Sequence, residues 1–303
     1  MAKKIRYDIK GRKSAAEIEG NTHRRKGLSL KTNRMIAYTV LVVVTVLCLF
    51  WFYVLFINAT RSHSELTKGF TALPSGNFAK NWKGLMEGTL PVWSGLMNSL
   101  LVSGLSALLC TYFSAMTAYA IHVYDFKLKK FMFTFILAVM TIPAQVSALG
   151  FVRLVTDMKL EDSFIPLIVP SIAAPVTFFY IKQYMDSNLP VSLVEAARID
   201  GSGEFHTFNN IVLPLVKPAI AVQAIFTFVS SWNNYFIPAL ILHDEDKKTL
   251  PILIAQLRSA DFLKFDMGQV YAMIAFSIFP VILVYLVLSR FIVQGVTMGS
   301  VKG

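Results

Sequence analysis

Residues 190–218 read PVSLVEAARIDGSGEFHTFNNIVLPLVKP, a polar stretch that lies between two long apolar runs. Its first part predicts a short helix, because Ser192 is a good N-cap and Glu195 follows at the capping-box spacing. One face of this helix carries two alanines, which let the backbone of a partner approach closely. We expect that face to contain Leu193, Ala196, Ala197 and Asp200.

Glycines and prolines end the helical segments of this stretch. Gly201 and Gly203 can take a positive φ and stop the first helix. A second run with helical spacing then ends near Pro214 and Pro218. Its apolar residues are Phe205, Phe208, Ile211 and Val212.

The composition is that of a membrane protein. The 303 residues are 55% apolar, and the mean hydropathy is positive. The apolar residues gather in runs such as Ile36–Ile57, which has no charge and would form a helix about 33 Å long. That run is too long for a signal peptide, so we expect a retained anchor. The two cysteines, Cys48 and Cys110, fall in such runs and offer neither a disulfide framework nor a metal spacing.

The runs predict an all-α polytopic membrane protein with six transmembrane helices. We expect a basic cytoplasmic tail, disordered, over residues 1–34 and a six-helix domain over residues 35–303, with a polar loop at 187–218. Small residues at Ser99, Ser103 and Ala107 suit close helix contact in the second span. The expected spans lie near residues 36–57, 93–121, 131–153, 164–185, 219–242 and 271–291.

Charge predicts the orientation. The net charge is +11, and residues 1–34 hold eleven Lys or Arg. If both termini share a side with loops 122–130 and 182–218, that side holds 19 of the 29 basic residues, so the positive-inside rule places it in the cytoplasm. The tail lacks interleaved aromatics and abuts a span, which favours attraction to the lipid bilayer over binding of nucleic acid.

Motifs for catalysis are missing from the sequence. It contains no phosphate-binding G-x-x-x-x-G-K-[ST] motif, no metal spacing among its histidines and no nucleophile–base pair, so we expect neither an enzyme nor a metal site. The spans also lack the ionisable relay of a proton-coupled carrier. Neutral side chains at Gln223, Asn233 and Asn234 suit a path for an uncharged, hydroxyl-rich solute; hydrogen bonding between helices explains each of them equally well.

Residues 195–214 resemble the Glu-Ala-Ala loop of membrane subunits of bacterial ABC importers, which have the MetI-like fold. The alternative for the same residues is an ordinary capped helix in a loop. Two further segments, SWNNYF at 231–236 and GVTMGSVKG at 295–303, resemble the carbohydrate-uptake branch, in which the maltose transporter permease MalG is a member. The matching residues of the loop are Glu195, Ala196, Ala197, Gly201, Ile211, Leu213 and Pro214.

The resemblance implies a permease subunit of an ATP-driven importer for a sugar or oligosaccharide, in the bacterial plasma (inner) membrane. Its partners would be a second, MalF-like permease, an ATPase dimer and an extracytoplasmic sugar-binding protein. ATP and Mg would bind the ATPase, and this chain would bind no cofactor. Glu195 would face a basic residue of the ATPase, which competes with its capping role. The implied ATPase-coupling residues are Glu195, Ala196, Ala197, Asp200, Gly201, Leu213 and Pro214, and the implied ATPase-contacting tail residues are Gly295, Gly299, Lys302 and Gly303.

Two alternatives remain open at this point. Glu-Ala-Ala loops occur across importers, so the solute could be another small molecule such as a polyamine or phosphate. The chain could also be a stand-alone, ion-coupled secondary carrier that uses backbone carbonyls for coupling.

Overall fold

The computed structural model describes residues 15–259 and 266–299, and all regular structure in them is helical, as the sequence predicts. Side chains are described for residues 31–143, 146–259 and 266–291. The helices are α1 (Ala15–Ala59), α2 (His63–Leu66), α3 (Phe78–Met86), α4 (Val92–Val123), α5 (Lys129–Val139), α6 (Ala144–Asp157), α7 (Ile165–Ile168), η1 (Val169–Ile172), α8 (Pro175–Asn188), α9 (Val191–Ile199), α10 (Glu204–His206), η2 (Thr207–Val212), α11 (Leu213–Leu215), α12 (Lys217–Trp232), α13 (Phe236–Ile241), η3 (Glu245–Lys247), α14 (Leu250–Arg258) and α15 (Met267–Gly299).

The chain divides into two units, Met1–Leu55 and Phe56–Gly303. In the first unit the structure describes α1, which begins at Ala15 inside the expected tail and continues without a break into the first expected span. The boundary between a tail at 1–34 and a domain at 35–303 stays a prediction.

Among the described residues, four helical stretches are long and apolar enough to cross a membrane: Lys31–Ala59, Val92–Val123, Ile165–Asn188 and Met267–Phe291. They match the first, second, fourth and sixth expected spans. The fifth is shorter than expected, because the helix ends at Trp232 and α13 begins only at Phe236. α12 meets the α10–α11 segment at a bend of 80°, and the two together have the length and composition of one further span.

The third expected span, residues 131–153, is wrong as a single helix. It consists of α5 and α6, which are separated at residues 140–143. Pro143 has an extended conformation there (φ −63°, ψ 127°) and precedes the first residue of α6. Proline lacks an amide hydrogen and disfavours helix in the residue before it, so an average of hydropathy over the run hides the break. Six crossings remain consistent with the structure if α5 and α6 together make one of them.

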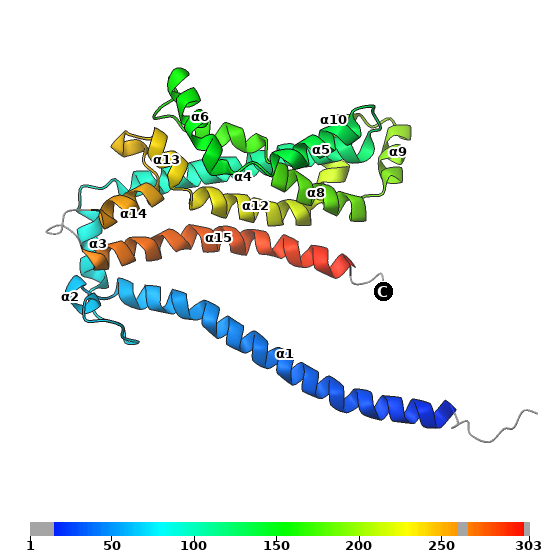
Figure 1. Cartoon of the computed structure of the whole chain (residues 1–303), viewed down its shortest axis with the longest axis horizontal. Helices are drawn as coiled ribbons and strands as arrows, with labels where there is room; N and C mark the ends of the chain where they lie inside the picture. Colours follow the sequence, from blue (N-terminus) through cyan, green and yellow to red (C-terminus); the bar gives the residue numbers. More distant parts are fainter. Residues whose placement is uncertain (1–14, 260–265, 300–303) are drawn as a thin grey trace, which may run out of the picture. The chain divides into compact units, whose positions relative to one another are not determined.

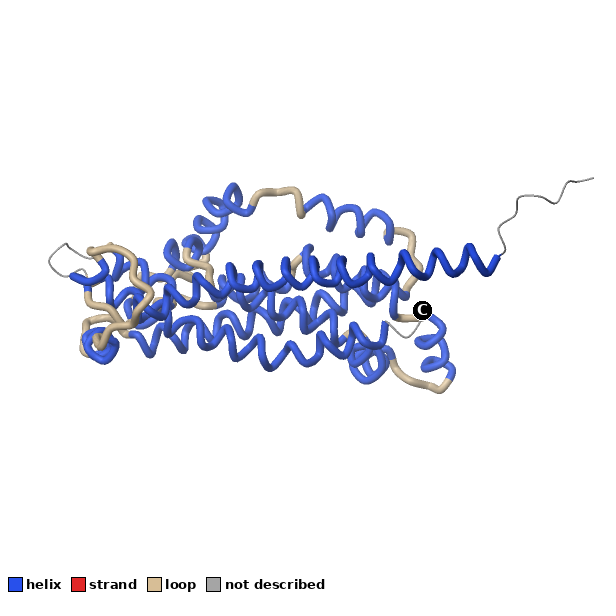
Figure 2. The backbone as a smooth tube through the Cα atoms, turned by 90° about the horizontal axis from the view of Figure 1, so that it is seen from below, coloured by secondary structure: helices blue, strands red, loops and turns tan. Residues whose placement is uncertain are grey.

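α4 is the central helix of the second unit. It packs against α8 and α12, and α12 packs in turn against α15 (Figures 1 and 2). Ser99, Ser103 and Ala107 are all buried, which confirms close packing along the face that carries the small residues. The connection that contains α9 lies at one end of α4, whereas α13 and α14 lie at the other (Figure 1).

Candidate functional site

α9 forms the first part of the polar loop, but its start differs from the prediction. Pro190 is the N-cap, in an extended conformation, and no side chain caps the helix. Ser192 therefore lies inside the first turn, and the predicted capping box is wrong. Glu195 is exposed, and its carboxylate has no hydrogen bond or ion pair within the described parts of the chain. The expected competition between capping and a partner does not arise, because Glu195 is left available for a partner.

The end of α9 is a Schellman motif, in which two amides bond back into the last turn. Gly201 donates its N–H to the carbonyl of Arg198 at 3.0 Å, and Ser202 donates to the carbonyl of Ala197 at 2.9 Å. Gly201 has a φ of +82°, which confirms its predicted role. Gly203 has a φ of −69° and precedes α10, so its predicted positive φ is wrong.

The two alanines of α9 face different environments. Val194 and Ala197 are buried against the rest of the chain, whereas Ala196 is exposed, so the single contact face expected from the sequence is wrong. Because 194 and 197 lie three residues apart, they form the inner side of the helix. The outer side carries Leu193, Glu195, Ala196 and Ile199; we call these four residues the outer face of α9.

Large apolar side chains are exposed at this end of the molecule. Ile199 is 86% exposed and Phe205, just beyond the Schellman motif, is 70% exposed. Ile199 was not predicted from the sequence, and Phe205 was expected only as part of a helical run. Two large apolar side chains in an otherwise polar loop are nevertheless a readable signal of an interaction surface. Asp200 is exposed at the C-cap of α9, while Leu213 is partly buried against the core and Pro214 is exposed.

The segment after α9 is wound as a π-helix over Thr207–Val212. Phe208 and Val212 are buried in the core, and α11 follows directly. A π-helical turn is rare and changes the direction in which the following side chains point. It is not readable from the apolar spacing, which fits an ordinary helix equally well.

A polar cavity of about 500 Å³ lies between α4, η1, α8 and α12. Ser106 and Cys110 bring it close to the middle of α4, in the part of the unit that is long and apolar enough to cross a membrane. The polar members of its lining are neutral: Ser106, Cys110, Ser171, Thr177, Gln223, Thr227, Ser230, Ser231 and Asn234.

This polar cavity contains two of the three path residues expected from the sequence. Gln223 is largely buried in its wall, and Asn234 lies at its edge. Asn233 is exposed and lines a different cavity, with Trp232 and Leu250, so the three residues are not brought together. The hydroxyl side chains from α4 and η1 were missed, because single serines in apolar runs give no signal of a shared cavity.

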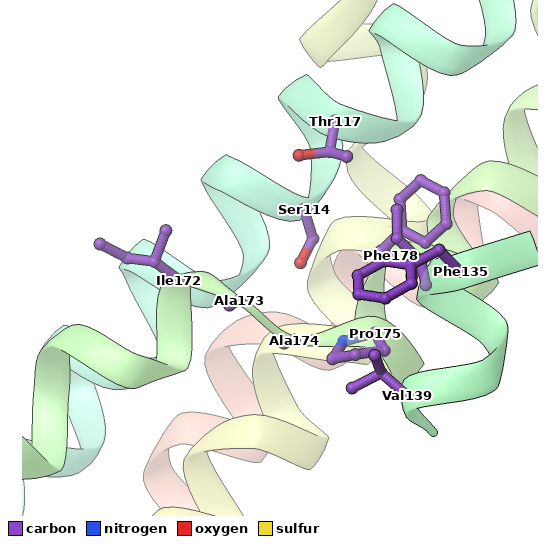
Figure 3. A pocket seen from close by; sticks show the side chains of 10 residues that line it. Ser114, Thr117, Phe135, Val139, Ile172, Ala173, Ala174, Pro175 and Phe178 are labelled. Carbon is purple, nitrogen blue, oxygen red and sulfur yellow. The ribbon is translucent and has the colours of Figure 1, made fainter. Parts of the chain in front are cut away.

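A further cavity, of about 460 Å³, lies between α4, α5, η1 and α8 (Figure 3). Apart from Ser114 and Thr117, its lining is apolar and includes Phe135, Val139 and Phe178. Such a lining has few partners for a hydroxylated solute. The polar cavity is therefore the better candidate for contact with a sugar.

Comparison with known proteins agrees with this arrangement. The model of the family described as "Binding-protein-dependent transport system inner membrane component" matches residues 89–298, which include α9 and the polar cavity. The chain belongs to this family. It is a membrane-embedded permease subunit of an ABC importer, a transport protein and not an enzyme. Family membership removes the alternative of a stand-alone ion-coupled carrier.

Three relatives show how far the similarity extends. The arabinooligosaccharides transport system permease protein AraQ of Bacillus subtilis is 33% identical over 86% of this chain and 93% of its own. The melibiose/raffinose/stachyose import permease protein MelC of the same organism is 28% identical over 83% of this chain and 91% of its own. A chain from a bacterial ABC transporter involved in the import of the acidic polysaccharide alginate has a TM-score of 0.72, at 22% identity, covering 86% of this chain and 97% of that one, which supports the MetI-like importer fold.

Membership also implies partners of a general kind. An importer of this class works with a second permease, an ATPase and a substrate-binding protein. Two of the expected tail residues, Gly295 and Gly299, lie in the backbone of α15, while Lys302 and Gly303 fall outside the described residues.

Proposed function

We propose that this chain is the permease subunit of an importer for a sugar or oligosaccharide, and that it carries half of the translocation path. The neutral polar cavity supports this, because hydroxyl and amide groups exchange hydrogen bonds with a sugar without the desolvation cost of a buried charge. Two permease relatives are named for the transport of arabinooligosaccharides and of melibiose, raffinose and stachyose. Gln223 and Asn234 would contact the solute, and Asn233 would not.

We further propose that the outer face of α9 docks on the ATPase, with both termini and α9 in the cytoplasm. The observation that carries this proposal is Glu195, an exposed carboxylate that has no hydrogen-bond or ion-pair partner among the described residues, beside the exposed side chains of Leu193 and Ile199. A charge next to apolar side chains is what a specific docking surface offers, since the apolar groups supply contact area and the carboxylate fixes the register. Ala196 leaves room for the partner, Gly201 ends the helix, and Asp200, Leu213 and Pro214 complete the connection.

In this scheme the ATPase dimer binds ATP and Mg, and this chain supplies only the docking helix α9 and half of the translocation path. The second permease would be MalF-like and would complete the path, and an extracytoplasmic sugar-binding protein would deliver the solute. The connections around α13 and α14 would face that protein. Residues 295–303 would reach the ATPase. The membrane would be the bacterial plasma (inner) membrane.

Reconstitution in liposomes tests this function. The complex of this chain with its partner permease, ATPase and binding protein is offered labelled raffinose, arabinotriose, putrescine and phosphate. We expect ATP-dependent uptake of at least one of the two sugars and none of putrescine or phosphate. Uptake of putrescine or phosphate alone would contradict a sugar as substrate, and sugar uptake that continues without ATP would contradict the ABC importer.

A further inference from the structure

α9 is attached to α4 at both of its ends. The attachments involve Tyr119 and His122, which lie three residues apart and therefore on one face of α4. We propose that the last two turns of α4 form a rigid mount for α9, so that movement of α9 is passed along α4 to the polar cavity. This inference rests on the proposed docking of α9 on an ATPase, and it adds Tyr119 and His122 as positioning residues.

His122 holds the N-terminal end of α9. Its Nε2 lies 2.9 Å from the carbonyl oxygen of Leu189, and its Nδ1 lies 2.8 Å from Oδ1 of Asp186. A carbonyl oxygen can only accept, so Nε2 carries a proton and donates to it. Leu189 closes α8 through its own amide, and the next residue, Pro190, caps α9. His122 therefore fixes the junction at which α8 turns into α9.

Asp186 is held from both sides. Nζ of Lys182, one turn earlier in α8, lies 2.6 Å from Oδ2 and 2.7 Å from Oδ1 of Asp186. The carboxylate thus connects α8 to His122 of α4, whose side chain is only 10% exposed. The side chains of His122 and Lys182 are only 10% and 13% exposed, whereas that of Asp186 is 39% exposed, so water reaches the carboxylate but little of its two partners.

Tyr119 holds the C-terminal end. Its hydroxyl donates to Oε2 of Glu204 at 2.9 Å, and Oε1 of the same carboxylate accepts from Nε of Arg198 at 2.6 Å. Arg198 belongs to the last turn of α9, and its guanidinium also lies over the ring of Tyr124, 5.1 Å from the centroid. α4 and the residue that caps it thus reach α9 through Glu204 and through a cation–π contact.

The middle of α9 is fixed by packing. Val194 is fully buried in one cluster with Tyr119 and Ala118 of α4 and Met185 of α8. A helix that is anchored at both ends and buried along its inner side cannot roll without breaking several contacts at once. α4 itself is 32 residues long, about 48 Å at 1.5 Å per residue, and it carries Ser106 and Cys110 of the polar cavity. A continuous physical connection therefore runs from α9 to the cavity.

Spin labels test the mount in the reconstituted complex, with ATP and Mg²⁺ as the probe. One label replaces exposed Ile199 of α9 and the other replaces Asp125, next to the residue that caps α4, in a chain whose two native cysteines are changed to serine. We expect the same distance with and without nucleotide, since α9 and the end of α4 move together. A distance that changes on addition of ATP would overturn the rigid mount.

Substitutions supply a second, independent test. Tyr119→Phe keeps the ring in the core and removes only the hydroxyl, and His122→Leu removes the bond to Leu189. In the double variant we expect basal ATP hydrolysis, without binding protein, to rise about fivefold, which corresponds to about 1 kcal/mol. The label distance should also broaden. His122→Gln, which restores a donor near the position of Nε2, should recover most of the loss.

The matched control is Tyr112→Phe. Tyr112 lies on α4 two turns before Tyr119, and its hydroxyl donates to Asn209 of η2 at 3.2 Å rather than to either end of α9. We expect unchanged ATP hydrolysis and label distance. If Tyr119→Phe and the double variant behave like the control in an assembled complex, the mount is wrong. If no ATPase assembles with the unmodified chain, the proposed function itself fails, which is a different result.

Discussion

At each end of the second unit, Phe56–Gly303, a carboxylate binds a segment that connects two helices, but its partners differ between the two ends. At one end Glu204 is bound by side chains, Arg198 of α9 and Tyr119 of α4. At the other, Asp162 accepts the backbone amides of His243 at 2.6 Å and Asp244 at 2.8 Å. The first arrangement joins a helix to a helix, whereas the second joins a loop to a loop. In the proposed scheme the α9 end transmits movement, whereas the Asp162 end only fixes the relative position of two loops.

The largest effect that separates the two ends is expected from charge reversal. Glu195→Arg should lower sugar import about thirtyfold and release the ATPase, because an unpaired or repelled charge in an interface costs about 2 kcal/mol or more. Asp157→Arg, an exposed residue at the end of α6, is the control and should leave ATPase binding unchanged. Co-purification of the ATPase measures both. Equal loss in the two variants would remove the distinction between the ends.

The next effect concerns the backbone at the end of α9. Gly201→Ala places a side chain at a φ of +82°, which costs about 1 kcal/mol. Thermal unfolding of the purified complex should shift down by about 2–4 °C. Gly203→Ala is the control, since Gly203 has an ordinary φ and a Cβ there meets nothing within 4 Å. Similar midpoints for the two variants would show that the Schellman motif contributes little.

A smaller effect is expected from the ion pair of α9. Arg198→Ala should reduce sugar import about threefold, a modest effect, because the pair is partly exposed (35% and 46%) and water screens it. Lys83→Ala breaks the pair of Lys83 with Glu87, which are 3.7 Å apart and more exposed. Lys83 belongs to α3, which lies near the end of the unit opposite α9 (Figure 1). Import by that variant should be unchanged. If Lys83→Ala lowered sugar import more than Arg198→Ala, the connection on which transport depends would lie at the α3 end and not at the α9 end.

The smallest effect is a pH dependence at Asp162. The amides of Asp244 and His243 lower the pKa of Asp162 below its ordinary value, so the stabilisation is complete above about pH 4 and is lost as the pH falls through the lowered pKa. Hydrogen exchange of the amides at 243 and 244 should accelerate in that acid range. Asp162→Asn keeps an acceptor and tolerates the φ of 55°. Its exchange should be independent of pH there, once intrinsic rates are subtracted; an unchanged dependence would assign the effect to another group.

Local features of the site were readable from the sequence, and contacts between distant segments were not. Gly201 was predicted correctly, because a Schellman motif depends on a few neighbouring residues. Ser192 was mistaken for the cap, because the helix is capped by Pro190, two residues before the hydroxyl position that the sequence suggested. Pro143 is a readable sign of a helix break, but averaging the hydropathy over residues 131–153 concealed it.

The mount could not have been predicted. Tyr119 and Glu204 are separated by 85 residues, and His122 and Leu189 by 67, so no spacing rule connects them. The inner and outer sides of α9 were likewise misassigned. Helical periodicity gives the angle between Ala196 and Ala197, but it does not tell which of the two faces the core. Only the packing of Val194 settles that choice.

Cross-linking from α9 tests the proposed docking most directly. Ile199→Cys, in a chain without its native cysteines, is treated with a short bifunctional reagent in inside-out vesicles that contain the whole complex. We predict a covalent product with the ATPase, and protection of the cysteine from a membrane-impermeant thiol reagent added to intact cells. Labelling of that cysteine from outside intact cells, with no product formed with the ATPase, would contradict the docking of α9.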